Sequence, residues 1–368
     1  MIHTTKKKLQ LLLKKFGYKL FKLFYSKVNK SEKVENNSNS KITASKIDNE
    51  YKYKVFTIDK VRMYTDTIND CAVIQNNKVL IGPSYQIRDT KFEKIENNIV
   101  FTKGTPRLKK RLKGKVLSLL TGGAGNFNYW HWLFDVLPRI NIVKNILSID
   151  QIDYFLFPNI KKNFQRETIN FLKIPIKKCI SSLDFRHIEC DQLITTEHPY
   201  VINNNATEAI QNLPKWIIKW LQLSFMKKFQ LEDHKFPKKI YIDRADASPN
   251  IIQRRKIINN NEVKQIASLN GYKILNLSDY SFQDQIKYFY NADKITGLHG
   301  AGFANVIFSK SGTSFLELKP YTAGKACENL AKNCELSYDC ISVIPEKNNE
   351  NNQMGSISIN INELEKKL

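Results

Sequence analysis

Strand-like and helix-like segments alternate along the second half of the chain, and this alternation constrains the fold more than any other feature. Four short runs rich in β-branched and aromatic residues are predicted as strands: 238–244, 271–277, 293–298 and 313–320. The segments 259–270 and 281–291 are predicted as helices, and a further helix is expected to begin at Gly302. Strands joined by crossover helices pair in parallel, so the second half predicts an α/β domain with a parallel sheet.

The length of 368 residues suits two domains of about 150 residues each. Strand-like runs begin near residue 51, and a long amphipathic segment at about 206–230 is followed by a polar stretch that we interpret as a boundary. We therefore expect one domain over 51–230 and a second over 231–345. Residues 1–50 are expected to form a basic segment and linker, and residues 346–368 a C-terminal tail.

The formal net charge is +23, and residues 1–50 alone hold twelve Lys against four acidic residues. Such an excess is typical of proteins that bind an anionic surface, whether membrane, nucleic acid or acidic polymer. It is equally typical of a soluble protein with a Lys- and Asn-rich composition. Charge alone does not decide among these alternatives.

The first thirty residues carry nine Lys and no acidic residue, and Leu and Phe recur between the lysines at roughly helical spacing. No apolar run is long enough for a signal-peptide core or a membrane span. The pattern predicts a basic amphipathic helix that lies on an anionic bilayer, or alternatively a solvated terminus. The six cysteines contain no C-x-x-C pair, which favours reduced thiols and a cytoplasmic protein. If the helix binds a bilayer, the protein is expected to be peripheral on the inner face of the plasma membrane.

A glycine-rich turn follows the predicted strand 293–298 and consists of His299, Gly300, Ala301 and Gly302. Glycines permit tight turning and close approach of the backbone, and the N–H groups that begin the next helix attract phosphate. The turn therefore predicts a diphosphate-binding loop. Two other interpretations stay open: a turn that binds no ligand, and a dinucleotide fingerprint in which Asn305 replaces the third glycine.

Charged side chains lie near the carboxyl ends of two predicted strands. Arg244 ends the strand 238–244, and Arg254 and Arg255 lie in the loop after it, whereas Glu317 lies near the end of 313–320. Guanidinium groups at such ends can grip a diphosphate, and a carboxylate there can accept ribose hydroxyls. Each residue alone is consistent with ordinary surface charge, but together with the glycine turn they favour an anion site.

A histidine and an aspartate four residues apart lie in the aromatic segment that runs from Asn128 to Arg139. If this segment is helical, His131 and Asp135 share one face. Such a pair can activate a hydroxyl group, because one side chain takes the proton while the other orients it. A structural contact between the two side chains is the alternative.

Taken in order, these motifs resemble glycosyltransferase family 61, whose bacterial members act in capsule and lipopolysaccharide synthesis. The matching segments are GGAGNFNYWHWLFDVLPRI (122–140), KKIYIDRADA (238–247), RKIINNNEV (255–263), LSDYSFQDQI (277–286), ADKITGLHGAGFANVIF (292–308) and FLELKP (315–320). Their ordered combination is more specific than any one motif. The resemblance does not cover the N-terminal 110 residues.

The resemblance implies an α/β fold of the GT-B type, with two Rossmann-like domains that face each other across a cleft. The first domain would bind the acceptor and the second the nucleotide sugar. The implied enzyme is an inverting glycosyltransferase that moves a sugar from a nucleotide-sugar donor to a hydroxyl of a growing surface glycan, such as capsule or O-antigen. The acceptor would be a glycan or lipid-linked glycan.

Carried over to this sequence, the family motifs assign three groups of residues. The donor-binding residues would be Arg244, Arg255, His299, Gly300, Ala301, Gly302, Asn305 and Glu317. The catalytic residues would be His131 and Asp135, with His131 as the first choice of base. Asn128 and Arg139 would line the acceptor side of the cleft.

The sequence contains no Asp-x-Asp tripeptide, so we expect neither a metal site nor a cofactor. The enzyme alternative is an NAD(P)-dependent dehydrogenase that uses the Gly300-x-Gly302 loop, and the non-enzyme alternative is a basic nucleic-acid-binding protein. A protein that binds the donor without transferring it is a third possibility. No helix-turn-helix, zinc-finger or RNA-binding signature is visible, so no specific nucleic acid is expected as a partner.

Overall fold

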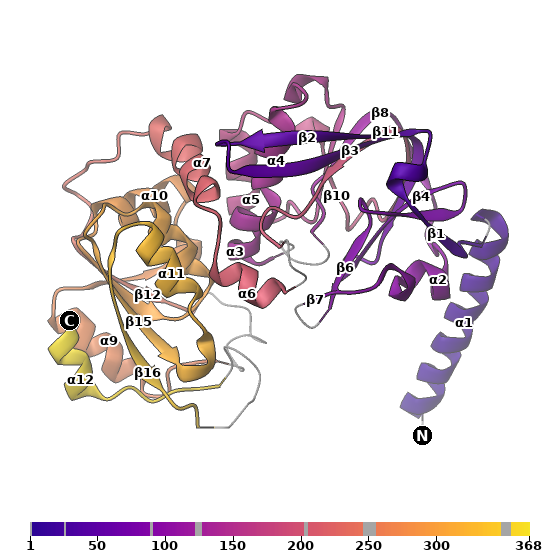
Figure 1. Ribbon diagram of the computed structural model, residues 1–368. Helices are drawn as coiled ribbons and strands as arrows, with labels where there is room; N and C mark the ends of the chain where they lie inside the picture. Colours follow the sequence, from indigo (N-terminus) through magenta and orange to yellow (C-terminus); the bar gives the residue numbers. More distant parts are fainter. Residues whose placement is uncertain are drawn as a thin grey trace. The chain divides into compact units, whose positions relative to one another are not determined.

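The computed structural model describes residues 2–25, 27–88, 91–121, 127–201, 205–245, 255–346 and 355–368, without the side chains of residues 2–9 and 207. The fold is α/β, as the sequence predicts. The chain divides into two compact units, coloured from indigo to magenta and from salmon to yellow in Figure 1. The first unit comprises Met1–Gln165 and Lys173–Thr207, and the second comprises Arg166–Leu172 and Glu208–Leu368.

A mixed sheet forms the first unit, with eleven strands among the described residues. The strands are β1 (Lys30–Lys33), β2 (Ser40–Ile47), β3 (Tyr51–Thr65), β4 (Asp70–Gln75), β5 (Lys78–Ile81), β6 (Tyr85–Arg88), β7 (Lys91–Phe92), β8 (Lys110–Ser118), β9 (Tyr154–Phe157), β10 (Cys179–Ser181) and β11 (His187–Thr196). The long strand β3 pairs antiparallel with β2, β4 and β11. Beyond it, β11, β8, β9 and β10 lie side by side in that order and run parallel.

The helical segments of the first unit connect these strands. They are α1 (Ile2–Tyr25), η1 (Val34–Asn36), η2 (Ile95–Asn97), α2 (Ile99–Lys103), α3 (Tyr129–His131), the π-helical turn η3 (Trp132–Val136), α4 (Pro138–Lys144), η4 (Ile149–Gln151) and η5 (Ile176–Lys178). Helix α5 (Asn163–Phe171) begins in the first unit and belongs to the second unit from Arg166 onward. No helix among the described residues has the length and apolar character needed to cross a bilayer.

Residues 31–50, expected to form a linker, contain strands β1 and β2 instead. All eight residues of β2 pair with β3, from Ser40 opposite Ile58 to Ile47 opposite Tyr51. The turn between the strands places Asp48 and Asn49 at φ values of 50° and 59°, a region that Asp and Asn tolerate better than other side chains. The hairpin turn therefore allows β2 and β3 to pair in a segment whose polar composition predicted a linker.

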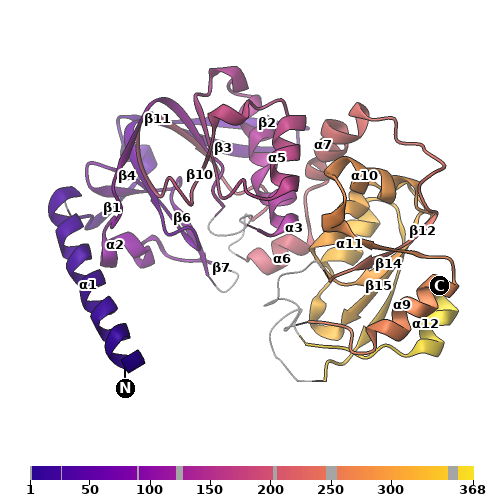
Figure 2. The same cartoon turned by 180° about the vertical axis from the view of Figure 1, so that it is seen from behind.

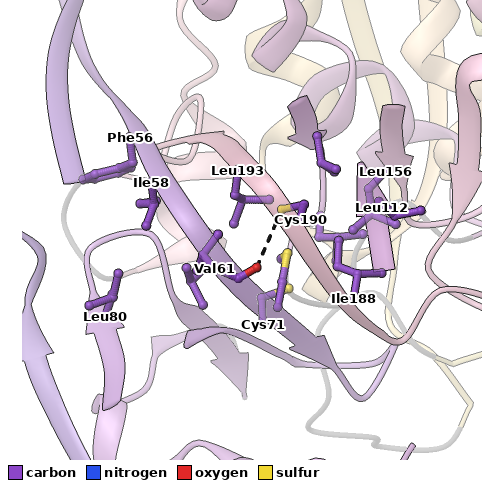
Figure 3. Packing of buried hydrophobic residues seen from close by; sticks show 14 of the residues in the cluster. Phe56, Ile58, Val61, Cys71, Leu80, Leu112, Leu156, Ile188, Cys190 and Leu193 are labelled. Atoms are coloured by element: carbon purple, nitrogen blue, oxygen red, sulfur yellow. Dashed lines mark hydrogen bonds between the residues drawn. The ribbon is translucent and has the colours of Figure 1, made fainter. Parts of the chain in front are cut away.

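The core of the first unit lies where β3, β4, β8 and β11 pack their apolar side chains together (Figure 3). Val61 of β3, Leu193 of β11 and Leu112 of β8 are at most 7% exposed. Cys190 joins this cluster, and its thiol donates a weak hydrogen bond to the Val61 carbonyl at 3.8 Å. The cysteines are all free thiols, and four of the six are buried, which is the packing role of a small apolar side chain.

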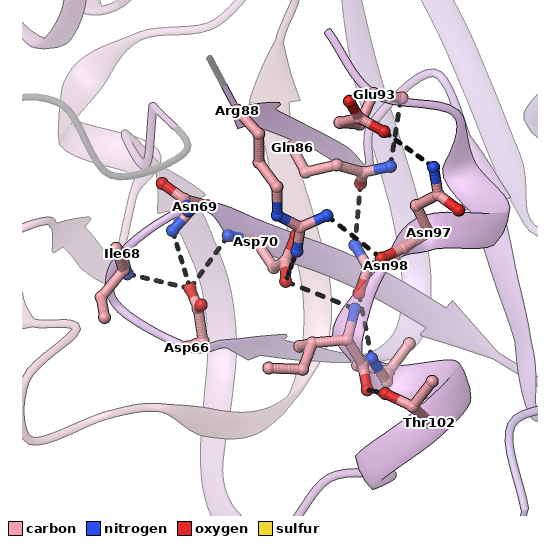
Figure 4. Close-up of polar contacts among 12 residues, drawn as sticks. Asp66, Ile68, Asn69, Asp70, Gln86, Arg88, Glu93, Asn97, Asn98 and Thr102 are labelled. Atoms are coloured by element: carbon pink, nitrogen blue, oxygen red, sulfur yellow. Dashed lines mark hydrogen bonds and ion pairs between the residues drawn. The ribbon is translucent and has the colours of Figure 1, made fainter.

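A polar network closes one end of this sheet (Figure 4). One carboxylate oxygen of Asp66 accepts hydrogen bonds from the backbone N–H groups of Ile68, Asn69 and Asp70, each at 2.9 Å. Arg88 donates to both oxygens of Asp70 at 2.8 and 2.6 Å. Burial raises the pKa of Asp70 to about 6, because it opposes ionisation more than Arg88 favours it. These residues fix the turn that precedes β4.

The second unit contains a five-stranded parallel sheet. Its strands are β12 (Lys239–Asp243), β13 (Lys273–Asn276), β14 (Lys294–Leu298), β15 (Ser314–Pro320) and β16 (Ser337–Val343), in the spatial order β13-β12-β14-β15-β16. The first four confirm the predicted strands. The fifth was not predicted from the sequence.

Helices cover both faces of this sheet (Figures 1 and 2). The helical segments are α6 (Ala206–Gln211), α7 (Lys215–Phe225), η6 (Met226–Lys228), α9 (Asn260–Leu269), η7 (Leu277–Asp279), α10 (Phe282–Asn291), η8 (Ala301–Phe308), η9 (Tyr321–Ala323), α11 (Ala326–Asn333) and α12 (Ile361–Lys367). Helices α9 and α12 pack on one face, and α10, η8 and α11 pack on the other. Of the segment 206–230, which we placed at the end of the first domain, residues 208–230 belong to this unit and contain most of α6 and all of α7 and η6.

Two further segments of the second unit differ from the sequence-based expectations. The helix expected at Gly302 is a 3₁₀ helix over Ala301–Phe308, and its last six residues are all buried, so it lacks the polar face of an amphipathic α-helix. The end of the expected C-terminal tail packs into the core, since Leu364 and Leu368 are buried against α9. The Asn-rich segment 347–354 lies outside the described residues.

The strand order creates one switch point in the sheet. From β12 the chain crosses to β13 on one side, and from β13 it returns past β12 to β14 on the other side. The connections that leave β12 and β14 therefore diverge at the carboxyl ends of these two neighbouring strands, the position at which open α/β sheets commonly form a ligand-binding crevice. Arg244 follows β12 and His299 follows β14, so the topology brings both to this position.

Candidate active site

The segment that carries His131 and Asp135 is irregular, and its irregularity places both side chains. Asn128 caps α3, because its side-chain oxygen accepts hydrogen bonds from the N–H groups of Trp130 at 3.0 Å and His131 at 3.5 Å. The next turn widens to π-helical geometry, in which Leu137 N donates to Trp132 O at 3.2 Å. Such turns occur frequently at functional sites. Residues 122–126, which begin the family-like segment 122–140, lie outside the described residues.

His131 and Asp135 are joined by a hydrogen bond of 2.8 Å between Nδ1 and a carboxylate oxygen. The imidazole is 29% exposed, whereas the carboxylate is only 3% exposed. Tyr200 donates its hydroxyl hydrogen to the other carboxylate oxygen, and His198 Nε2 lies 3.7 Å from the first. Among the described residues, these protein groups enclose the carboxylate, and His131 is the most exposed of the three.

The hydrogen bonds of the two histidines define their tautomers. His198 Nδ1 accepts from the backbone N–H groups of Tyr200 and Val201 at 3.4 and 3.2 Å, so its hydrogen lies on Nε2, which faces Asp135. His131 presents Nδ1 to Asp135, so the neutral ring carries its hydrogen there. This arrangement leaves Nε2 of His131 as the nitrogen that can take up a proton.

His131, His198 and Asp135 form a histidine cluster, and their pKa values follow from burial and from the charge of the Asp135 carboxylate. Burial opposes ionisation of Asp135, but His131 and His198 outweigh it and lower the pKa of Asp135 below its ordinary value. Burial also lowers the pKa of His131, but the charge and hydrogen bond of Asp135 raise it above its ordinary value. The pKa of His198 is lowered because burial prevails there. His131 is therefore the basic member of the cluster.

Arg139, expected on the acceptor side, makes its hydrogen bonds to protein groups of the first unit. Its side chain is fully buried, and all five of its N–H hydrogens have acceptors within the first unit. The acceptors are Thr195 Oγ1, Thr196 Oγ1 and the Thr196 carbonyl at 2.8–2.9 Å, Tyr85 Oη at 2.7 Å, and the Leu120 carbonyl. Arg139 thus ties α4 to the carboxyl ends of β8 and β11, next to the histidine cluster.

Glycines allow close packing around β14 in the second unit. A Cβ atom on Gly297 would lie 2.5 Å from the Ile242 carbonyl oxygen of β12, and its φ of +152° is unfavourable for other residues. A Cβ atom on Gly300 would lie 2.8 Å from Cζ of Arg244. Arg244 donates a hydrogen bond to the His299 carbonyl, so its guanidinium group lies directly against the glycine turn. The turn and the arginine therefore form one surface.

A second arginine reinforces this cationic surface. Arg255 is 8% exposed, and burial together with the charge of Arg244 lowers its pKa to about 9. Two guanidinium groups held close together are stabilised by an anion that contacts both. Arg254 and the loop from 246 onward lie outside the described residues.

Both oxygens of the buried Glu317 carboxylate are bonded to protein side chains. One of its oxygens is bonded to His299 Nδ1, the other accepts the Tyr338 hydroxyl hydrogen at 2.6 Å, and the side chain is 1% exposed. Burial opposes its ionisation, but these partners lower its pKa. Burial lowers the pKa of His299, and the charges of Arg255 and Arg244 add to this effect. Glu317, which the sequence predicted to accept ribose hydroxyls, thus already has a protein partner at each carboxylate oxygen.

The remaining residues expected on the donor side, Asn305, Gly302 and Ala301, differ in their burial and contacts. Asn305 is fully buried and donates to the Gln285 side chain at 3.0 Å, so it packs within the unit. Gly302 contacts the core, since a Cβ atom there would lie 2.8 Å from Leu277. Ala301 is half-buried at the start of η8.

One group of side chains in the described residues has metal-ligand character, namely His299, Glu317 and Cys327. Burial raises the pKa of the Cys327 thiol well above its ordinary value, so the thiolate that binds metals is disfavoured. The imidazole nitrogen nearest to the thiol, at 3.6 Å, is the one that is bonded to Glu317. These residues therefore fit a hydrogen-bonded cluster better than a metal site.

His198 and Tyr200 were missed by the sequence analysis. They follow β11, and β11 pairs in parallel with β8, whose carboxyl end leads toward His131. Polar residues after a predicted strand were the available signal, but their relevance depends on the pairing of β11 with β8. The sequence does not reveal that pairing.

Comparison with known proteins adds the family. The model of the family described as Glycosyltransferase 61 matches residues 129–316, which is 188 of the 368 residues and just over half of the chain. The match begins one residue after Asn128, ends one residue before Glu317, and contains both His131 and the glycine turn. A search of curated proteins found no match. The match over half of the sequence shows that the chain belongs to glycosyltransferase family 61.

Proposed function

We propose that this glycosyltransferase moves a sugar from a nucleotide-sugar donor to a hydroxyl group of a glycan acceptor, with inversion at the anomeric carbon. The observation that carries the proposal is the 2.8 Å hydrogen bond between His131 and the buried Asp135, within the segment that matches the family. In a GT-B-type arrangement of two Rossmann-like domains, the first unit would bind the acceptor and the second the donor. A surface polysaccharide made at the cytoplasmic side of a membrane is the proposed product.

His131 is the proposed base. Its Nε2 takes the proton of the acceptor hydroxyl as the oxygen attacks the anomeric carbon and the bond to the donor's phosphate oxygen breaks. Asp135 holds the tautomer through Nδ1 and balances the charge of the imidazolium ion that forms. The burial of Asp135 argues against the alternative in which the carboxylate itself takes the proton.

Arg244 and Arg255 are proposed to bind the diphosphate of the donor. They lie at the carboxyl ends of β12 and β14, where parallel α/β sheets bind their ligands. As the sugar leaves, negative charge grows on the diphosphate, and guanidinium groups stabilise that charge. His299, held by Glu317, lies beside the same surface.

The first prediction concerns pH. Because the pKa of His131 is raised, catalysis should fall as the pH drops through that value and protonates Nε2. Replacing Asp135 with Asn removes the charge that raises this pKa, so the acidic limb of kcat/KM should move to lower pH. The rate itself should fall by about 10²–10⁴-fold. Kinetics from pH 5 to 9 with wild type, Asp135→Asn and His131→Gln measure both effects.

His234 supplies the matched control, since it is an exposed histidine. His234→Gln should keep both the wild-type rate and the wild-type pH profile. Wild-type kinetics in both Asp135→Asn and His131→Gln would remove the pair from the mechanism.

The second prediction concerns metals. The cationic surface of Arg244 and Arg255 supplies the charge that a chelated divalent ion supplies in other enzymes, so transfer is expected to continue in EDTA. Product formation with and without EDTA, followed by addition of manganese, measures this. A rate that collapses in EDTA and returns with manganese contradicts the metal-free mechanism.

Helix α1 supports a proposed association with an anionic membrane. Leu12, Phe16 and Leu23 are 62%, 68% and 82% exposed, and lysines lie between them. The last turn is fixed to the first unit, because Lys22 donates to the Thr102 carbonyl at 2.7 Å and Tyr25 Oη accepts from Lys109 N at 3.0 Å. Exposed apolar and basic side chains on one anchored helix fit the surface of an anionic bilayer.

The third prediction tests this association. The full chain should co-sediment with vesicles that contain phosphatidylglycerol and much less with pure phosphatidylcholine vesicles, and added salt should reduce binding. Leu12→Gln with Phe16→Gln should weaken it, whereas Leu269→Gln, an exposed site in the second unit, should not. Equal sedimentation with both lipids, or tighter binding to random DNA than to anionic vesicles, would refute the membrane proposal.

A further inference from the structure

A cavity of about 500 Å³ lies within the first unit, next to the histidine cluster. Its walls come from the start of β3, the turn between β5 and β6, the residues around β7, and the segment after β11. This volume lies in the range of roughly 300–1,000 Å³ that is typical of small-molecule sites. The cavity is thus large enough for one or two sugar rings.

Aromatic rings form one wall of the cavity. Phe92 lies between Tyr85 and His198, with ring centroids at 6.1 and 6.2 Å and interplanar angles of 80° and 75°. Tyr51 and Tyr53 add to the lining, and the Tyr53 hydroxyl donates to the Pro199 carbonyl at 2.7 Å. Such rings offer flat apolar surfaces that can pack against the C–H faces of a sugar.

Acidic residues give the cavity a charge opposite to that of the protein. Glu50, Glu93 and Glu197 line it with Lys52, in a chain that has 58 basic and 35 acidic residues. Local donors orient two of these carboxylates: Lys54 N lies 2.8 Å from Glu197, and the Asn97 amide lies 2.7 Å from Glu93. Carboxylates repel phosphate and accept hydrogen bonds from hydroxyl groups. The lining therefore disfavours a nucleotide diphosphate and suits a polyhydroxyl ligand.

His198 links the cavity to the proposed catalytic pair. It lines the cavity, and its Nε2 lies 3.7 Å from Asp135, which is bonded to His131. A ligand in the cavity would thus be separated from Asp135 by a single side chain.

We propose that this cavity is a binding site for a sugar residue of the acceptor glycan that carries no negative charge. The identification of this ligand as the acceptor rests on the proposed function, because the lining itself indicates only the chemistry of the ligand. Phe92 and the neighbouring rings hold the sugar face, and the carboxylates accept its hydroxyl hydrogens. The anionic donor is excluded from this cavity and binds at the arginines of the second unit.

Ligand-observed NMR and calorimetry on the full chain test the site with trisaccharides as probes. The neutral probes are trimers of glucose, galactose, mannose and N-acetylglucosamine, and a heparin trisaccharide supplies negative charge. At least one neutral trimer should bind more tightly than the heparin trisaccharide, because the carboxylates of the lining repel an anion. Phe92→Ala and Glu50→Lys should each weaken its binding by about tenfold or more.

Tyr321→Ala and Glu232→Lys serve as matched controls, because both residues are exposed and belong to the second unit. They should leave binding of the neutral trimer unchanged, and thermal unfolding should confirm that all four variants are folded. The proposal is overturned if no neutral trimer binds, if the heparin trisaccharide binds more tightly, or if Phe92→Ala and Glu50→Lys bind like the wild type.

Measurements of binding and of transfer in the variants Phe92→Ala and His131→Gln separate this proposal from the proposed function. His131→Gln should abolish transfer but retain binding of the neutral trimer, since His131 does not line the cavity. If the trimer binds and no sugar is ever transferred, the cavity assignment stands and the proposed function fails. If transfer occurs and Phe92→Ala leaves the acceptor KM unchanged, the function stands and the cavity assignment fails.

Discussion

The hydrogen bond between His131 and the buried carboxylate of Asp135 is the interaction on which this account of the first unit depends. A carboxylate that is almost completely buried is stable only with partners, and here His131, Tyr200 and His198 surround it. The π-helical turn brings Asp135 into the interior, and Arg139 ties the surrounding strand ends together. Core packing and polar contacts thus combine to leave one imidazole nitrogen as the basic position.

The second unit uses the same chemical pair with the opposite result. His299 is bonded to Glu317 as His131 is bonded to Asp135, yet its pKa is lowered and that of His131 is raised. The difference follows from the surroundings, since burial and two neighbouring arginines oppose a positive charge on His299. A neutral histidine beside cationic groups suits a surface that binds an anion. A basic histidine beside a lone carboxylate suits proton uptake.

The sequence predicted those helices and strands whose pattern of apolar residues lies within the element itself. The four strands and two helices of the second half follow from short runs of apolar residues, and the glycine turn after β14 follows from its composition. The hairpin of β2 and β3 was missed because its strongest signal, Asp48 and Asn49 in a left-handed turn, lies in a segment that is polar throughout. The approach of His198 and Tyr200 to Asp135 depends on the pairing of β11 with β8, which joins residues far apart in the chain.

Residue type also proved a poor guide to exposure. The family resemblance implied that Arg139 lines the acceptor side, and Glu317 was expected to contact ligand because it lies near a strand end. Both side chains are buried and bonded to protein groups. Such contacts are visible only when the partners are known, since Thr195, Thr196 and Tyr338 are distant in the sequence.

The central claim is that the two imidazole–carboxylate pairs are tuned in opposite directions, and NMR titration of the histidine rings tests it most directly. Long-range ¹H–¹⁵N spectra of the full chain, assigned with His131→Asn and His299→Asn, would follow both rings with pH. The account predicts that His131 titrates above the ordinary value of about 6.5 and His299 below it. Titration of both rings at a common pH, or in the reverse order, would contradict it.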